Sequence, residues 1–328
     1  MEIFGDTATV YRDFATEAYG SACFREWALG VAGDPHVLAW LQTLPERKRQ
    51  ANLVFAAARW HGVPAPGPYA GLRAALLADD GPIRTTILER ATQTNEVGRL
   101  ATLYPALAGL GTRPLALLEV GASAGLCLYP DRYSYRYGGG EDLDPREGTS
   151  TVVLHSAVIG VPPLRMPDVV WRAGIDLAPL DAADADDRRF LLSLVWPGED
   201  GRAARIDAAL HIAAADPPLL VRGDAAERGA LAELAALAPR NATLVITTPG
   251  VLPHIARAGR ERLGESIASL DAVWISIDPP GLHVQGAAPV DPATWGGFVL
   301  RRDGVPLAAV DPLGAFVEWR GGRANDAR

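Results

Sequence analysis

The sequence contains few of the residues that build metal centres and cross-links. Two cysteines, Cys23 and Cys127, occur among 328 residues, too few for a disulfide framework or for a zinc site made of cysteines. Six histidines are scattered, without a His-x-x-x-His or comparable spacing. We therefore expect no bound metal ion, and we expect Cys127 to pack in the protein rather than to react.

Two further absences concern partners. No apolar run is long enough to cross a membrane, and the acids Glu2 and Asp6, with no apolar core, argue against a secretory signal peptide. Positive charge is also not in excess, since the formal net charge is −8, which argues against a nucleic-acid-binding surface. The sequence thus predicts a soluble, cytoplasmic protein with neither a membrane nor a nucleic-acid partner.

The sequence can form a large hydrophobic core, because 48% of the residues are hydrophobic. Residues 1–110 read as a helical region, with apolar residues at helical spacing and no convincing strand. From residue 111 onward, short apolar strands alternate with helices as far as Ile277, and a hairpin around Asp303 and Gly304 follows. Alternation of this kind predicts an α/β domain with a mostly parallel sheet. We expect a small β insertion at about residues 133–165.

The stretch that organises the chain is residues 114–126. Leu115 to Val120 form a short apolar run typical of a buried parallel strand. Gly121, Ser123 and Gly125 follow as small residues that let the backbone turn sharply and approach a ligand. We expect a short helix directly afterwards, whose N-terminal N–H groups would face that ligand.

Two chemistries compete for this turn. The segment Glu119-Val-Gly121-x-Ser123-x-Gly125 resembles the first motif of class I S-adenosylmethionine-dependent methyltransferases, an acid followed by Gly-x-Gly-x-Gly, with Ser123 in place of the middle glycine. The same letters spell Gly-x-Ser-x-Gly, the nucleophile elbow of serine hydrolases, with His254 or His283 available as a base. A tight turn without any ligand is the third interpretation.

The rest of the chain favours the methyltransferase resemblance. Later strands end in Asp176 and Asp224, and an acid after the second strand of a nucleotide fold accepts hydrogen bonds from ribose hydroxyls. The segment before Leu115 is helical and offers no strand for an oxyanion loop, which disfavours the hydrolase. The resemblance implies a Rossmann-like sheet with a terminal antiparallel hairpin. It also implies S-adenosylmethionine as cofactor, an unknown small-molecule substrate, and cofactor contacts from Glu119, Gly121, Ser123, Gly125, Asp176 and Asp224. A methyltransferase-like protein that has lost catalysis and only binds remains the alternative.

A narrower resemblance runs along nearly the whole chain. It rests on Thr92-Gln-Thr-Asn-Glu-Val-Gly-Arg99, Leu118-Glu-Val-Gly-Ala-Ser-Ala-Gly125, Trp171-Arg-x-Gly-x-Asp176 and Val195-Trp-Pro197. These segments resemble a bacterial family known only by a domain-of-unknown-function label, which has a helical region before its methyltransferase-like fold. That resemblance brings no substrate.

The polar cluster at residues 92–99 precedes the central strand directly. Asn95 and Arg99 are four residues apart and so share one helical face. We expect this cluster to border the crevice outside the strand ends, although capping of the following helix would explain it equally well. The predicted substrate-binding residues are Arg49, Gln50, Gln93 and Asn95. The predicted catalytic residues are Glu96, Arg99 and His254, the last as a proton-transfer group.

Overall fold

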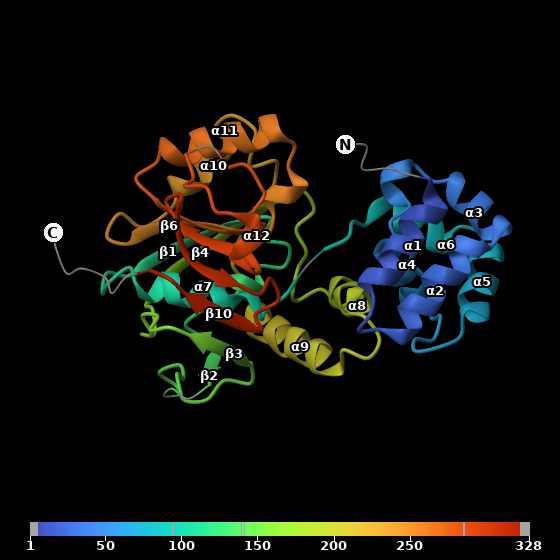
Figure 1. Ribbon diagram of the computed structural model, residues 1–328, viewed down its shortest axis with the longest axis horizontal. Coiled ribbons are helices and arrows are strands. Elements are labelled where there is room, and N and C mark those ends of the chain that lie inside the picture. The colour runs from blue at the N-terminus through green and yellow to red at the C-terminus, as the bar shows by residue number, and fades with distance from the viewer. Residues whose placement is uncertain (1–5, 94, 139, 141, 285, 322–328) are drawn as a thin grey trace. The chain divides into compact units, whose positions relative to one another are not determined.

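The computed structural model describes residues 6–93, 95–138, 140, 142–284 and 286–321, and the chain divides into two compact units (Figure 1). The helical unit comprises residues 1–94 and 184–207, and the sheet unit comprises residues 95–183 and 208–328. The sequence suggested a contiguous helical region and a boundary near residue 110. In the structure, residues 95–110 belong to the sheet unit, and a later helical segment joins the helical unit.

The helical unit is built from short helices, two of which begin at a capping aspartate. Asp34 caps α3 by accepting hydrogen bonds from His36 N and Val37 N, and Asp184 caps α8 in the same way. The elements are α1 (Thr7–Glu17), α2 (Ala22–Gly33), α3 (Pro35–Gln42), η1 (Glu46–Lys48), α4 (Ala51–Trp60), α5 (Tyr69–Leu77), α6 (Pro82–Glu89), α8 (Ala185–Leu194) and the start of α9 (Asp200–Ala215).

The core of the helical unit is aromatic. Phe24 and Phe55 pack edge to face with ring centroids 5.0 Å apart, and Trp27 contacts Phe55 at 5.4 Å. The segment after α8 is fastened to α4, because Trp196 Nε1 donates to Asn52 Oδ1 at 2.9 Å. This contact explains why residues from the middle of the sequence complete an N-terminal helical unit.

The sheet unit contains a mixed sheet of ten strands in the order β2-β3-β10-β9-β8-β7-β6-β1-β4-β5. Most neighbouring strands are parallel, and β7, β8, β9 and β10 form antiparallel pairs in succession. The strands are β1 (Leu115–Val120), β2 (Ser134–Tyr137), β3 (Val153–Ile159), β4 (Val169–Asp176), β5 (Leu219–Arg222), β6 (Thr243–Pro249), β7 (Val273–Asp278), β8 (Phe298–Arg302), β9 (Val305–Val310) and β10 (Phe316–Trp319).

The order in which strands are added to the sheet reverses at β1. β4 and then β5 extend the sheet on one side of β1, and β6 and then β7 extend it on the other. In an open sheet, such a reversal leaves a crevice outside the carboxyl ends of the strands. The hairpin between β8 and β9 turns at Asp303 and Gly304, both with positive φ, as its sequence predicted. The expected β insertion supplies β2 and β3, which extend the same sheet beyond β10.

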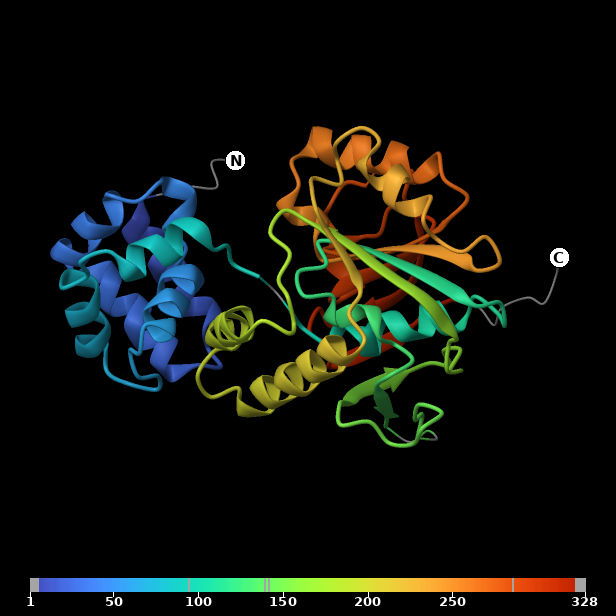
Figure 2. The same cartoon turned by 180° about the vertical axis from the view of Figure 1, so that it is seen from behind.

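Helices cover both faces of the sheet (Figures 1 and 2). α10 (Ala230–Ala235) and α11 (Arg257–Ala268) pack on one face, where Leu118, Ile175, Ile246 and Leu263 belong to a single hydrophobic core. Figure 2 shows α7 (Arg99–Ala108) on the opposite face, where it contacts β3, β7 and β8. Alternate residues of β1 therefore point to opposite helix layers, and Glu119 points away from the α10–α11 core.

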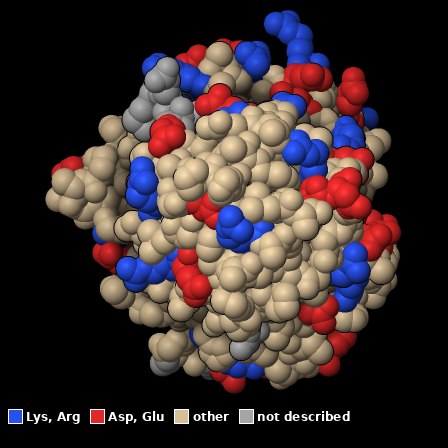
Figure 3. Space-filling model, turned by 90° about the vertical axis from the view of Figure 1, so that its right-hand side faces the viewer, with Lys and Arg blue, Asp and Glu red and all other residues tan. Residues whose placement is uncertain are grey.

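The remaining described elements are η2 (Leu126–Leu128), η3 (Leu252–His254) and α12 (Pro292–Trp295). None of the helices within the described residues combines the length and apolar character that crossing a membrane would require. On the face of the helical unit shown in Figure 3, acidic and basic side chains are interspersed among uncharged residues.

Candidate functional site

The turn after β1 has an unusual backbone that its small residues permit. Gly121, Ser123 and Gly125 have φ angles of 73°, 52° and 72°. Residues other than glycine rarely adopt this region of backbone conformation. A Cβ atom on Gly121 would lie 2.5 Å from Val251 Cγ2. The glycine is therefore needed both for its φ angle and for the close approach of the segment after β6.

Asp176, at the end of β4, holds this turn. Its Oδ2 accepts a hydrogen bond from Ser123 N at 2.8 Å, and its Oδ1 accepts one from Ala178 N at 2.8 Å. A carboxylate has about four acceptor positions, so these two bonds leave capacity for a ligand. The half-buried Asp176 is thus a fixed part of the turn, and its contact with a ribose stays a prediction.

Asn95 reaches the same turn from the segment before α7. Its Nδ2 donates to Ser123 Oγ at 2.6 Å, and its Oδ1 accepts from Ala124 N at 3.2 Å. Both side chains are buried, with 7% of Asn95 and 3% of Ser123 exposed. The structure therefore brings together three residues that the sequence could only place on separate segments, namely Asn95, Ser123 and Asp176.

Arg99 begins α7 and lies against the end of β6. Its Nη1 donates to Pro249 O at 2.7 Å, and its Nε donates to Pro312 O at 3.0 Å. A Cβ atom on Gly250 would lie 3.3 Å from the guanidinium carbon. Gly98 packs so closely that a Cβ there would collide with the carbonyl oxygen of Leu313. Arg99 is thus fixed at the carboxyl edge of the sheet.

Two buried acids lie near Arg99. Burial raises the pKa of Glu119 to about 8, against the opposing charge of Arg99. Glu119 is 4% exposed, and its Oε2 has no hydrogen-bond partner among the described residues. Glu96 is also buried, and its Oε1 accepts a hydrogen bond from Gly98 N at 2.9 Å. Cys127, which is half-buried, donates from Sγ to Glu96 O at 3.5 Å.

His254 and Asp224 are the exposed residues among those predicted in the sheet unit. His254 lies in η3 after β6, and partial burial together with the positive charge of Arg99 lowers its pKa below 6.5. Its imidazole is therefore predominantly neutral at pH 7 and can accept a proton. The exposed Asp224 follows β5, and its Oδ1 accepts a hydrogen bond from Ala226 N at 2.8 Å.

Asp278, at the end of β7, was missed by the sequence reasoning. It is fully buried, and its oxygens accept no hydrogen bond of good geometry within the described chain. Burial raises its pKa to about 7, against the Ser276 hydroxyl and the charges of Arg301, Arg260 and Arg99. The position of Asp278 at the end of a strand resembles that of Asp176, but the sequence does not show its burial.

Three predicted substrate-binding residues belong to the helical unit. Arg49 donates to the carbonyl oxygens of Leu44 and Gln42 and so binds the end of α3. Gln50 precedes α4, and its Oε1 accepts a hydrogen bond from Thr92 Oγ1 at 2.6 Å. Gln93 is half-buried in the same unit. Their contribution to a site in the sheet unit stays a prediction.

One expectation about the central turn was wrong. The sequence suggested a short helix after it, but the structure has only the three-residue 3₁₀ turn η2. Pro130 disfavours a helical conformation at Tyr129, and the Tyr129 and Tyr133 hydroxyls bond to Asp216 O and Leu126 O. No helix dipole is therefore available there to bind a ligand, and any ligand would be held by the backbone N–H groups and side chains of the turn.

The comparisons with known proteins concern the family only. No curated protein and no solved structure matches the chain. Residues 8–319 match the family described as "Uncharacterized protein conserved in bacteria (DUF2332)", a range that includes every candidate site residue. The chain therefore belongs to this DUF2332 family.

Proposed function

We propose that the protein is an S-adenosylmethionine-dependent methyltransferase with a Rossmann-like sheet unit, acting on a small molecule. The observation that carries this proposal is the position of the turn Gly121–Gly125. It lies at the strand from which the sheet order reverses, and the acid that ends the adjacent strand β4 holds it. In open α/β sheets, nucleoside-containing ligands bind in this crevice.

The residues present fit a nucleoside cofactor. Gly121 and Gly125 keep the backbone of the turn free of side chains, and Asp176 retains acceptor capacity for a hydroxyl group. Asp224, one strand further along, has an exposed carboxylate that can accept hydrogen bonds from the ligand. When bound, S-adenosylmethionine would supply an electrophilic methyl group, so that the protein has mainly to orient the acceptor and remove its proton.

The acceptor would then lie on the β6 and β7 side of the turn. His254 is accessible there and predominantly neutral at pH 7, so it can take a proton from an acceptor. Arg99 is fixed beside it by two backbone carbonyl groups, which orient its guanidinium toward the carboxyl edge of the sheet. Glu96 is buried at the start of the same segment.

Calorimetric titration with S-adenosylhomocysteine tests the proposal. We expect a dissociation constant in the micromolar range, about −8 kcal/mol. Asp224→Ala should weaken binding by roughly 1–3 kcal/mol, since it leaves ligand groups without a partner, whereas Glu261→Ala on the exposed face of α11 should not. Asp176→Ala should weaken binding and also lower stability, because it releases the turn. Absence of binding at millimolar ligand to a folded protein would reject the proposal.

A binding protein without catalysis is the alternative. It predicts that S-adenosylhomocysteine binds with the same dependence on Asp224 but that no labelled methyl group leaves S-adenosylmethionine for any acceptor in a metabolite extract. Methyl transfer that is lost in His254→Ala, with cofactor affinity unchanged, would favour the enzyme.

A further inference from the structure

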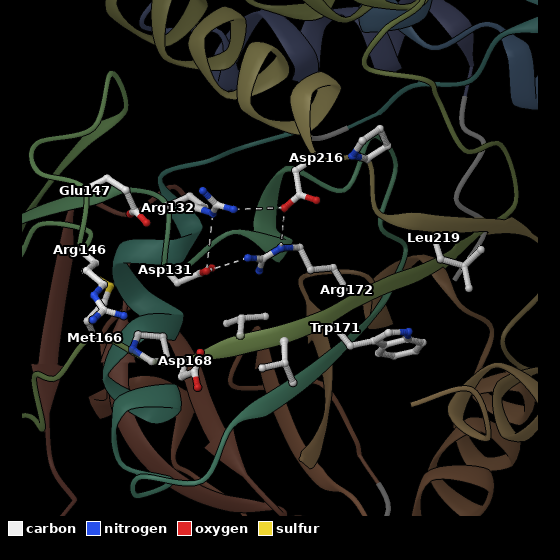
Figure 4. Close-up of a pocket in the computed structure, with 14 residues that line it drawn as sticks. Asp131, Arg132, Arg146, Glu147, Met166, Asp168, Trp171, Arg172, Asp216 and Leu219 are labelled. Carbon is white, nitrogen blue, oxygen red and sulfur yellow. Dashed lines mark hydrogen bonds and ion pairs between the residues drawn. The ribbon is translucent and has the colours of Figure 1, made fainter. Parts of the chain in front are cut away.

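A pocket of about 720 Å³ lies at the amino-terminal ends of β4 and β5. The candidate site lies at the carboxyl ends of the strands. Its walls include Arg172 in the first half of β4 and Leu219 at the start of β5, whereas Asp176 ends β4 and Asp224 follows β5. The other walls come from the residues after η2, from Arg146 and Glu147, and from the residues before β4 and before β5 (Figure 4). The pocket is therefore separate from the crevice that would hold the cofactor.

The pocket is organised around Arg172, whose side chain is 8% exposed and held on three sides. Its Nη2 donates to Asp131 Oδ2 at 2.7 Å, and its Nη1 donates to Leu128 O at 2.7 Å. The guanidinium carbon lies 4.8 Å from the ring centroid of Tyr129, a cation–π contact that fixes the plane of the group. Arg172 is thus a preorganised cation at the pocket wall.

Asp216 is held much more loosely. It lies 3.8 Å from Arg172 Nε and 3.5 Å from Arg132 Nη2, and its side chain is 56% exposed. Contacts of this length are too long for good hydrogen bonds, and an exposed ion pair of this kind stabilises a fold very little. Figure 4 shows Asp216 at one corner of a four-membered arrangement with Arg132, Asp131 and Arg172. The carboxylate of a ligand could take its place and bind both arginines at shorter distance.

The same arrangement also requires a hydrogen-bond donor. Asp131 Oδ1 is buried, and it has no hydrogen-bond partner among the residues that the structure describes. A buried acceptor without a partner is unfavourable. Asp131 contacts Arg172 and Arg132, the two arginines that Asp216 also contacts (Figure 4). A molecule that supplies a donor next to its carboxylate would satisfy both needs at once.

The charges and the apolar walls restrict the ligand further. Three arginines and four acids line the pocket, so a multiply charged anion such as a nucleotide phosphate would meet as much repulsion as attraction. Asp168 and Glu147 add negative charge around the pocket, where a cationic group is favoured. The walls also include Met166 and Val170, of which Val170 is 49% exposed. These side chains can cover an apolar part of the ligand.

We propose that this pocket binds a small zwitterion, a molecule with a carboxylate and an ammonium group on an apolar frame, as in a free amino acid. The carboxylate displaces Asp216 and bridges Arg172 Nε and Arg132 Nη2. The ammonium group donates toward the carboxylates of Asp131 and Asp168. The apolar remainder lies against Met166 and Val170. This assignment does not depend on the proposed methyltransferase activity.

Calorimetry or ligand-observed NMR with leucine, 3-methylbutylamine and 4-methylpentanoate tests the assignment, because the last two each lack one charge of leucine. We expect leucine to bind with a dissociation constant of about 1 mM or tighter and each fragment at least ten-fold more weakly. Arg132→Gln, at an exposed residue that the fold does not need, should weaken leucine binding at least five-fold. Asp216→Asn should strengthen it several-fold, since it removes the competing internal carboxylate. Arg113→Gln, an exposed arginine outside the pocket, is the matched control and should change nothing.

Several results would overturn the assignment. These are no saturable binding of leucine to the folded protein, binding of 4-methylpentanoate as tight as that of leucine, or an affinity that Arg132→Gln leaves unchanged. Weakening by Asp216→Asn would contradict the exchange of carboxylates. S-adenosylhomocysteine carries its own zwitterionic tail, so its binding is measured in Arg132→Gln as well. The cofactor site requires loss in Asp224→Ala and no loss in Arg132→Gln, which separates the failure of one proposal from that of the other.

Discussion

The side-chain amide of Asn95 spans the turn after β1, with Nδ2 2.6 Å from Ser123 Oγ and Oδ1 3.2 Å from Ala124 N. One side chain thereby satisfies a hydroxyl group and a backbone amide in a segment where Ser123 has a φ of 52°. The segment before α7 and the turn after β1 are therefore parts of one structure. A polar residue in this position serves the shape of the site whether or not it also contacts a ligand.

Replacing Asn95 by alanine should lower stability by about 1–3 kcal/mol, because it leaves a buried amide and a buried hydroxyl without their partner. Since the turn would then shift, we also expect weaker binding of S-adenosylhomocysteine. Urea unfolding and calorimetry on the same variant measure both effects. Asn241→Ala, at an exposed asparagine, is the control. Lower stability with unchanged affinity, measured well below the melting temperature, would assign Asn95 a purely structural role.

Two substitutions at Ser123 should differ in their effect on stability. Ser123→Gly loses the hydrogen bond from Asn95 but relieves the positive φ, whereas Ser123→Ala loses the bond and keeps the unfavourable backbone conformation. We expect both variants to be less stable than the parent chain and Ser123→Gly to be the more stable of the two by about 1 kcal/mol. Denaturant unfolding at pH 7 measures the difference.

The same residue separates the methyltransferase from the hydrolase. If Ser123 is a turn residue, a fluorophosphonate probe should leave the protein unlabelled, since the hydroxyl is buried and accepts a hydrogen bond from Asn95. Labelling is measured by intact mass. Stoichiometric modification that disappears in Ser123→Ala would instead support a nucleophilic serine.

Much of the sheet unit could be predicted because its signals are local. The apolar run at Leu115–Val120 and the small residues after it indicated the strand and its turn, and Asp303-Gly304 indicated the hairpin. The helix after the turn was misjudged because Pro130 and the tyrosine hydroxyl bonds favour an irregular path. The break between α1 and α2 near Gly20 and Ser21, where the Ser21 side chain accepts from Phe24 N, was also not foreseen.

The site was harder to predict because its contacts join segments far apart in the sequence. Asn95 and Ser123 are 28 residues apart, and Ser123 and Asp176 are 53 residues apart. The sequence identified all three residues but not that they bond to one another. Asp278 was missed because nothing in a strand-end acid shows that it will be buried, and burial is what raises its pKa.

Gly121→Ala tests how closely the segment after β6 packs on the turn. The new Cβ would lie 2.5 Å from Val251 Cγ2, at a φ of 73°. Gly111→Ala provides a matched control, because Gly111 has a φ of 87° and nothing within 4 Å of a Cβ. The control should cost about 1 kcal/mol from backbone strain alone, and Gly121→Ala should cost at least twice as much. Equal losses of unfolding free energy would contradict the close approach.

Glu119 should make stability depend on pH in a direction opposite to that of most acids. Burial raises its pKa from 4.5 to about 8, so the folded chain keeps a proton that the unfolded chain releases above pH 4.5. Stability then falls as pH rises from about 4.5 to 8, and the loss is constant above that range. Asp278, with a pKa of about 7, contributes a similar loss that is complete at lower pH.

Glu119→Gln removes this dependence while keeping the shape of the side chain. We expect the variant to match the parent chain at pH 5 and to be more stable at pH 8, by on the order of a few kcal/mol for a shift of this size. Asp278→Asn should be more stable than the parent chain by an amount that stops growing near pH 7. The two curves of stability against pH therefore distinguish the two acids. Urea unfolding of both variants from pH 5 to 9 measures them. A gain that is as large at pH 5 as at pH 8 would mean that Glu119 is already ionised in the folded protein, and that Arg99 outweighs its burial.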